Sequence, residues 1–185
     1  SVLRHDPDRV MVGEIRDAET AQIAVQAALT GHMVFSTVHA NSALDVIGRF
    51  MHMGLDLYSV VSALNGVMAQ RLLRTNCPQC IRPYIAPHDE LVRRGIEASP
   101  HHAFARGHGC PHCRQTGYRG RQAIAEFLQP TPEIEHLIFS RAEHTEIERA
   151  AVAAGMVTMF DAGLDAALSG TTTIEEVVRS IRAEA

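Results

Sequence analysis

Residues 9–17 read Arg9-Val10-Met11-Val12-Gly13-Glu14-Ile15-Arg16-Asp17, and residues 31–41 read Gly31-His32-Met33-Val34-Phe35-Ser36-Thr37-Val38-His39-Ala40-Asn41. Each segment contains a short apolar run rich in β-branched residues with a glycine close by, which predicts a buried strand of a parallel sheet. Glu14 and His39 follow these two runs. Because ligands of open α/β sheets bind at the carboxyl ends of the strands, Glu14 and His39 are candidate site residues.

The segment between these two strands predicts a helix over residues 18–29. Asp17 precedes the helix as a capping residue, small side chains recur along one face, and Gly31 follows as a stop signal. A strand, a helix and a second strand together predict a βαβ unit, and its crossover should be right-handed.

The same residues carry a family resemblance. Residues 6–17, Asp-Pro-Asp-Arg-Val-Met-Val-Gly-Glu-Ile-Arg-Asp, resemble the Walker B segment of the ATPases that power type II secretion and type IV pilus assembly, and residues 31–41 resemble their His box. The similarity continues to the C-terminus. It implies an α/β fold, namely the C-terminal half of a RecA-like P-loop ATPase domain with a tetracysteine zinc insertion and a C-terminal helical region.

The resemblance also implies roles for the two candidate residues. Glu14 would polarise the attacking water, and His39 would bind the γ-phosphate and sense its loss, with ATP and Mg²⁺ bound in the intact parent protein. Gly13 stands where many P-loop ATPases have an Asp that helps hold Mg²⁺, as it does in the secretion family. From position alone, Glu14 is equally a solvated residue after a strand. A lone histidine is more often structural, and this is our interpretation of His32.

The basic residues bear on which part of an ATPase domain this chain contains. All 17 are Arg, and the sequence contains no Lys. A P-loop needs a Lys on a glycine-rich turn to reach the β- and γ-phosphates. We therefore expect the phosphate-binding half of the ATPase to lie upstream of Ser1, and the isolated chain to be inactive. The roles of Arg16 and Asp17, including a place in a subunit-interface network, are not established by spacing.

Composition and charge argue against several classes of protein. A hydrophobic content of 46% supports an ordinary core, and a net charge of −4 without a basic run argues against nucleic-acid binding. No apolar run approaches the roughly 20 residues that span a bilayer, and no signal peptide is recognisable. Together with the resemblance, this predicts a cytoplasmic protein, peripheral at the inner membrane.

Four cysteines form two Cys-x2-Cys pairs, Cys77 with Cys80 and Cys110 with Cys113. Four thiolates from two tight turns suit a tetrahedral structural zinc site without an open position. Disulfides or a thiol–disulfide active site at Cys110–Cys113 are the alternatives. No thioredoxin-like unit surrounds either pair, which favours metal. His108 and His112 are near enough to be substitute ligands, but we expect neither to bind.

The remaining chain predicts further helices and one hairpin. Helices are expected over residues 43–53, 57–64, 132–140, 145–154, 157–168 and 174–182, with Asn41 or Ser42 capping the first of these and Thr173 the last. A strand over residues 67–74 should pair with residues 122–128, so that the cysteines lie on an insertion. We expect three parts: an ATPase core over residues 1–74, a zinc module over 75–121, and a return strand with helices over 122–185.

Two functional hypotheses follow. The first is part of a hexameric ATPase that hydrolyses ATP to assemble pseudopilins or pilins, with inner-membrane platform proteins as partners. The second is a non-catalytic zinc-bearing interaction module, in which arginines around the cysteines dock on acidic proteins or anionic lipid. The sequence does not separate type II secretion from pilus assembly.

Overall fold

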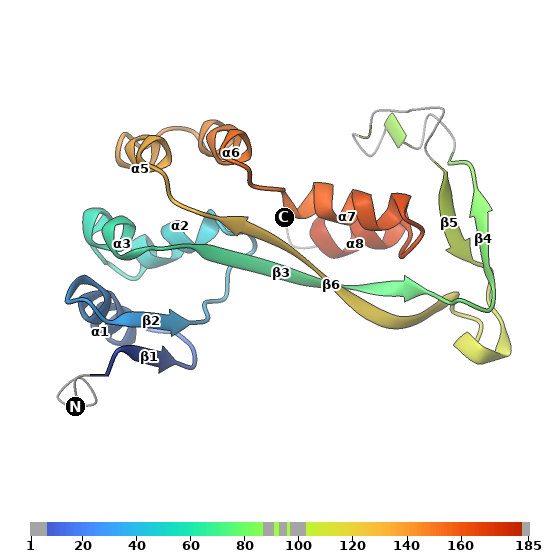
Figure 1. Cartoon of the computed structure of the whole chain (residues 1–185), viewed down its shortest axis with the longest axis horizontal. Helices are drawn as coiled ribbons and strands as arrows, with labels where there is room; N and C mark the ends of the chain where they lie inside the picture. The colour runs from blue at the N-terminus through green and yellow to red at the C-terminus, as the bar shows by residue number, and fades with distance from the viewer. Residues whose placement is uncertain (1–6, 87–90, 93–95, 97–102, 183–185) are drawn as a thin grey trace. The chain divides into compact units, whose positions relative to one another are not determined.

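The computed structural model describes residues 7–86, 91–92, 96 and 103–182 and has an α/β fold (Figure 1). The chain divides into two compact units. The first comprises Ser1–Ala69 and Phe127–Met156, and the second comprises Gln70–Glu126 and Val157–Ala185. Each unit is described separately below.

The first unit begins with the expected βαβ arrangement. Strand β1 (Arg9–Val12) pairs in parallel with β2 (Met33–Ser36), and the register places Arg9 opposite Met33 and Val12 opposite Ser36. Helix α1 (Ala18–Leu29) connects them with the predicted bounds. Its cap is also confirmed, because Oδ1 of Asp17 accepts a hydrogen bond from the backbone N–H of Thr20 at 2.8 Å.

The expectation that both strands are buried is wrong. Val12 and Val34 pack against the core formed with α1, but Met11 is 80% exposed and Phe35 is 56% exposed. The physical reason is that successive side chains of a strand point to opposite faces. In this chain the helices described cover one face of the β1–β2 pair, so an apolar run does not by itself bury both faces.

In the described part of the first unit, four further helices follow: α2 (Asp45–His52), α3 (Leu57–Ala63), α5 (Pro132–Phe139) and α6 (His144–Ala153). Helix α2 starts two residues later than expected. Neither Asn41 nor Ser42 is its N-cap, although Ser42 and Asp45 exchange hydrogen bonds between side chain and backbone in the turn before it. A shared core holds these helices together; it includes Leu44, Ile47, Val61, Leu128, Ile134 and Ile138.

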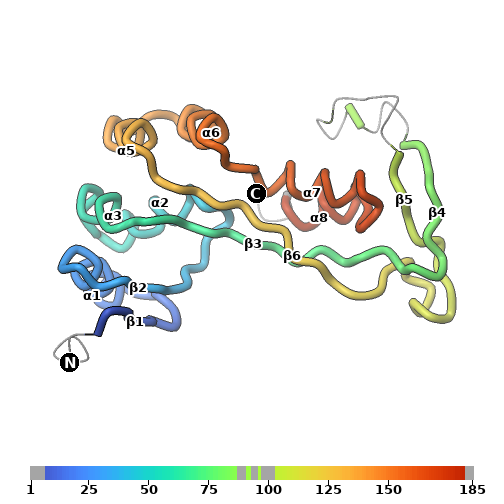
Figure 2. The backbone as a smooth tube through the Cα atoms, in the orientation of Figure 1, coloured from blue at the N-terminus to red at the C-terminus, as the bar shows by residue number. Residues whose placement is uncertain are grey.

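Two long strands contribute residues to both units. Strand β3 (Val67–Asn76) pairs with β6 (Tyr118–Leu128), and the two run in opposite directions (Figure 1). The predicted pairing is confirmed, although both strands are longer than expected. The segment between them contains the four cysteines, and Figure 2 shows that it also includes β4 and β5. Along this part of the chain, the insertion predicted from sequence is therefore present.

The second unit contains a short antiparallel pair, β4 (Ile81–Tyr84) and β5 (Phe104–Gly107), and the helices α7 (Met159–Leu168) and α8 (Ile174–Arg182). Helices α7 and α8 pack closely at Gly163, where an added Cβ would lie 2.7 Å from Cγ1 of Val177. A glycine inside α7 is therefore explained by the close approach of α8.

Buried polar side chains anchor α8 to β3 in the second unit. The carboxylate of Glu176 is fully buried and binds Arg74 and Arg179 through N–O distances of 2.6 Å. Burial opposes ionisation, but the hydrogen bonds from Arg179 and Arg74 prevail and lower the pKa of Glu176 to about 2. Thr173 caps α8 as predicted, because its Oγ1 accepts a hydrogen bond from the backbone N–H of Glu176 at 3.1 Å.

A second buried polar group lies at the end of β3. Nδ2 of Asn76 lies 2.9 to 3.0 Å from the carbonyl oxygens of Ala105, Gly170 and Thr172. The amide therefore ties β3 to β5 and to the loop between α7 and α8.

Within the described ranges, no helix is long and apolar enough to cross a bilayer.

Candidate active site and metal centre

Glu14 and His39 are brought together by the ends of β1 and β2. Because Val12 lies opposite Ser36, both strands end at the same edge, and the loops that follow are hydrogen-bonded to each other. The backbone N–H of Ile15 donates to the carbonyl of Thr37 at 2.9 Å, and Oγ1 of Thr37 donates to the carbonyl of Gly13 at 2.8 Å. These two bonds fix the backbone on either side of Glu14.

The carboxylate of Glu14 contacts two cationic or ionisable side chains. Its Oε1 lies 2.7 Å from Nε2 of His39, and its Oε2 lies 2.6 Å from both Nε and Nη2 of Arg16. The Glu14 side chain is 23% exposed, whereas those of His39 and Arg16 are 82% and 74% exposed. Glu14 is thus the half-buried centre of the group, with its two partners toward solvent.

The charge state of Glu14 follows from these contacts. The hydrogen bond from Arg16 lowers the pKa of Glu14 below its ordinary value, partial burial acts in the opposite direction, and the charges of Arg16 and His39 lower it further. An ionised carboxylate accepts hydrogen bonds and does not donate them. At neutral pH, Glu14 is therefore ionised and can orient a water molecule by accepting a hydrogen bond from it.

Sequence reasoning missed Thr37, whose hydrogen bond to Gly13 joins the two loops. A threonine in an apolar run gives no sign of such a bond, because the partner carbonyl is distant in the sequence. His32 does not belong to the group. Its Nδ1 lies 3.1 Å from the carbonyl of Ala27 at the end of α1, in accord with a structural role.

The four cysteines converge on one point in the second unit. All four Sγ atoms lie within 4.8 Å of one another. The Sγ–Sγ distances are 3.8 Å for Cys77–Cys110, 3.9 Å for Cys80–Cys113 and 3.7 Å for Cys110–Cys113. Four sulfurs around a tetrahedral ion with bonds of about 2.3 Å would be about 3.8 Å apart. The group therefore fits a four-coordinate metal ion.

Two tight turns present these thiols. The backbone N–H of Cys80 bonds to the carbonyl of Cys77 at 3.2 Å, and Cys113 bonds to Cys110 in the same way at 3.2 Å. Backbone N–H groups of Cys110 and Gly117 also point at Sγ of Cys113, at 3.2 and 3.3 Å. Burial alone would raise the pKa of Cys113, but these N–H donors outweigh it and lower the pKa to about 6.

The disulfide alternative does not fit this structure. All four cysteines are free, and the 3.7 Å between the Sγ atoms of Cys110 and Cys113 far exceeds the roughly 2.05 Å of a disulfide bond. Neither His108 nor His112 belongs to the metal-ligand group found in the described part of the chain. A cluster of four cysteine thiols is what could hold the ion.

The fold and these two sites define an α/β domain with a tetracysteine centre. The structure resembles those of the DotB ATPases. For the ATPase DotB of Legionella pneumophila the TM-score is 0.64 at 22% identity, covering all of this chain and 41% of that one. For DotB of Yersinia pseudotuberculosis the TM-score is also 0.64 at 21% identity, covering 96% and 38%.

Sequence comparison identifies the family, which the structural comparison does not. A model of the family described as "Type II/IV secretion system protein" matches residues 1–179, and the chain belongs to that family. It is 45% identical over 184 residues to the type II secretion system protein E of Pseudomonas aeruginosa, covering all of the chain and 36% of that protein. It is 47% identical over 179 residues to the type IV pilus assembly ATPase PilB of Thermus thermophilus, covering 95% and 20%. The chain thus spans about a third or less of these relatives.

Proposed function

We propose that this chain supplies the water-activating acid and the phosphate-sensing imidazole of a secretion ATPase. The observation that carries the proposal is the 2.7 Å contact between Oε1 of Glu14 and Nε2 of His39 at the shared carboxyl edge of two parallel strands. In ATP hydrolysis a water must be held in line with the γ-phosphate while negative charge develops. In this proposal Glu14 polarises that water, and His39 donates a hydrogen bond to the phosphate.

The intact protein is proposed to be a hexameric P-loop ATPase that assembles pseudopilins for type II secretion, or pilins for a type IV pilus. It would bind ATP and Mg²⁺, work in the cytoplasm at the inner membrane, and have platform proteins as partners. The names of the relatives, one from each system, support this pair of alternatives. The 185 residues alone have no Lys for a P-loop, and we propose that they do not hydrolyse ATP by themselves.

The experiment that tests this function is Glu14→Gln in the intact ATPase. The amide keeps the shape of the side chain but cannot accept a proton from water. We expect turnover to be abolished and ATP binding to be retained, as measured by steady-state hydrolysis and nucleotide titration. Glu19→Gln, on the exposed first turn of α1, is the matched control and should be fully active. Retained turnover in Glu14→Gln would refute the assignment.

The tetracysteine group is proposed to hold a structural zinc ion. Cys77, Cys80, Cys110 and Cys113 supply four thiolates and leave no position for a substrate, so the ion would fold the module and not catalyse. The spacing of the sulfurs and the N–H groups directed at Cys113 support this proposal. When bound, zinc supplies a crosslink between two turns distant in the sequence.

A second candidate function is an interaction module for anionic partners. Residues 75–121 contain seven Arg against three acidic residues. Arg82 and Arg106 lie directly opposite each other in the β4–β5 register, and in the described part of the chain neither has an ion-pair partner. Like charges opposite each other destabilise a strand pair, so a bound anion would relieve them.

This candidate is tested by the binding of the zinc-loaded chain to acidic protein segments and to anionic vesicles at increasing salt. In whichever of the two assays wild type binds, the double variant Arg82→Gln/Arg106→Gln should bind more weakly than wild type. The salt dependence of its binding should also be weaker. Unchanged binding, or binding to neither anion, would remove this function.

A further inference from the structure

Arg16 has a side chain that is 74% exposed, and it contacts Glu14 through two of its nitrogens. Both Nε and Nη2 of the guanidinium lie 2.6 Å from one oxygen, Oε2. The other oxygen, Oε1, faces only His39 among the described charged side chains. The two carboxylate oxygens of Glu14 are therefore distinguished by their partners.

The backbone around Arg16 is anchored on both sides. Ile15 before it is 4% exposed and donates its N–H to the carbonyl of Thr37. Asp17 after it accepts hydrogen bonds from the N–H and the hydroxyl of Thr20 at the start of α1. Arg16 thus extends from an anchored stretch of backbone, and its planar guanidinium loses less freedom per hydrogen bond than the ammonium of a lysine would.

The two partners of Glu14 differ in how easily they can leave. His39 makes one contact, from the loop after β2, with a side chain 82% exposed. Arg16 makes two contacts to a single oxygen from within the same loop as Glu14. Movement of His39 away from Glu14 would therefore uncover Oε1, which is buried in this structure, while Oε2 keeps both contacts to Arg16.

We propose that Arg16 is a positioning residue, which holds Oε2 of Glu14 so that Oε1 is the oxygen presented to the attacking water, and which keeps the carboxylate ionised. This inference rests on the proposed role of Glu14. A lysine would supply charge but not two N–H groups in a fixed plane, so Arg16→Lys should preserve ionisation and lose orientation. The lowered pKa of Glu14, for which the Arg16 hydrogen bond is the largest cause, supports the second half of the proposal.

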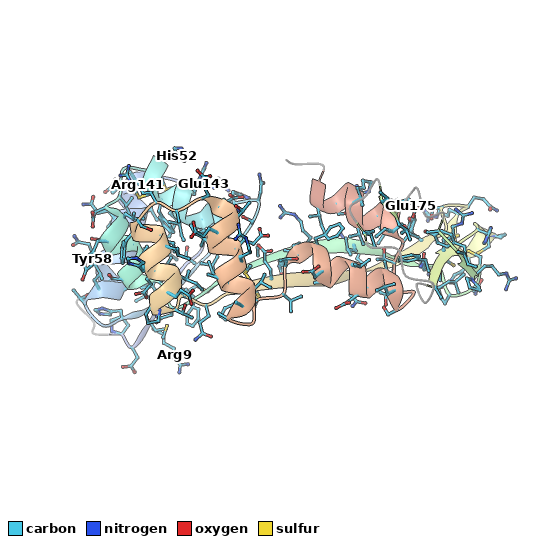
Figure 3. The ribbon with its side chains drawn as sticks, turned by 90° about the horizontal axis from the view of Figure 1, so that it is seen from above. Arg9, His52, Tyr58, Arg141, Glu143 and Glu175 are labelled. Atoms are coloured by element: carbon cyan, nitrogen blue, oxygen red, sulfur yellow. The ribbon has the colours of Figure 1, made fainter. Side chains whose placement is uncertain are left out.

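The first test uses this chain and needs no activity. The Glu14 carboxyl is followed by carbon-detected NMR during a pH titration, with its signal identified by its loss in Glu14→Gln. Arg16→Gln should move the Glu14 titration to higher pH, because a cation that stabilises the carboxylate has been removed. Arg9→Gln makes the same charge change on β1, where the side chain projects from the ribbon (Figure 3), and should leave the titration unchanged. An unmoved titration in Arg16→Gln would overturn the proposal.

The second test uses the intact ATPase. Arg16→Gln should lower kcat by about 10²-fold, which is the cost of a misplaced catalytic group, and should leave KM for ATP unchanged. It should also shift the acid limb of the pH–kcat profile to higher pH. Arg16→Lys should restore the acid limb but not kcat. If Glu14→Gln is inactive while Arg16→Gln keeps the wild-type kcat and profile, this inference fails and the proposed function survives. If Glu14→Gln is active, the proposed function fails.

Discussion

Nε2 of His39 lies 2.7 Å from Oε1 of Glu14, and the two residues reach each other only because β1 and β2 end at the same edge. The contact makes His39 the partner that occupies the oxygen proposed to act on water. In the proposed mechanism the imidazole exchanges this oxygen for phosphate during turnover, so substitution of His39 should affect chemistry more than binding.

His39→Ala in the intact ATPase is expected to lower kcat by roughly 10²-fold, within the range for a positioned hydrogen-bonding group, with a smaller change in KM. His39→Asn keeps a donor and should recover part of the loss. His52→Asn, on the exposed face of α2, is the control and should have wild-type kinetics (Figure 3). Equal losses in kcat for His39 and His52 variants, measured by steady-state hydrolysis, would contradict a specific role.

Much of the local structure could be predicted from sequence because its causes are local. Asp17 and Thr173 cap helices through bonds to residues three positions away, and both predictions are confirmed. The Cys-x2-Cys spacing predicted two turns, which also form within a few residues. The α/β fold and the family follow from the same ordered motifs.

What could not be predicted depends on residues far apart in the sequence. The prediction that Met11 is buried is wrong, because an apolar run does not say which face of the strand the neighbouring elements cover. The bond from Thr37 to Gly13, and the choice of Oε2 of Glu14 by Arg16, are decided by how two loops meet. The catalytic roles of Glu14 and His39 stay predictions until the intact ATPase is tested.

Glu176 should stabilise the second unit in a pH-dependent way. Its folded pKa of about 2 lies below its ordinary value of 4.5, so its contribution is fully present above pH 4.5 and is lost as the pH falls toward 2. Glu176→Gln should cost about 2 kcal/mol at pH 7, because charged hydrogen bonds to Arg74 and Arg179 are lost. Urea unfolding should show this deficit shrinking at pH 3.

The neighbouring Glu175 provides the control for this measurement. Glu175 lies in the first turn of α8, is less buried, and contributes to none of the bonds that hold Arg74. Glu175→Gln should therefore change the free energy of unfolding little at either pH. A Glu176→Gln deficit that is the same at pH 7 and pH 3 would show that the carboxylate charge is not the cause.

Asn76 should be sensitive to loss of its amide nitrogen. Three carbonyl oxygens lie within 3.0 Å of its Nδ2, so Asn76→Asp would place a carboxylate oxygen against them. We expect a loss of about 3 kcal/mol in the free energy of unfolding, since a buried charged group would be left without donors. Asn65→Asp makes the same change at an exposed position and should be nearly neutral by urea titration. An Asn76→Asp variant with an unchanged free energy of unfolding would contradict the anchoring role of Asn76.

Removal of the metal provides the last prediction. The purified chain should contain about one zinc per molecule by mass spectrometry, as one four-cysteine site requires. A chelator should lower the melting temperature, because metal binding and folding of such a module are coupled. Cys113→Ser should lose both the zinc and the chelator effect, since Cys113 accepts N–H bonds from two sides and closes the group.

His112→Ala separates a ligand role from mere proximity, because His112 is adjacent to Cys113 but lies outside the four-thiol group. It should retain zinc at the wild-type ratio and melt with the same response to chelator. Binding through three cysteines and His112 would instead halve or abolish retention in this variant. Isolation of the chain with Cys77–Cys80 and Cys110–Cys113 disulfides and no metal would refute the zinc site. The sulfur atoms would then not have in solution the 3.7 to 3.9 Å spacing that supports metal binding.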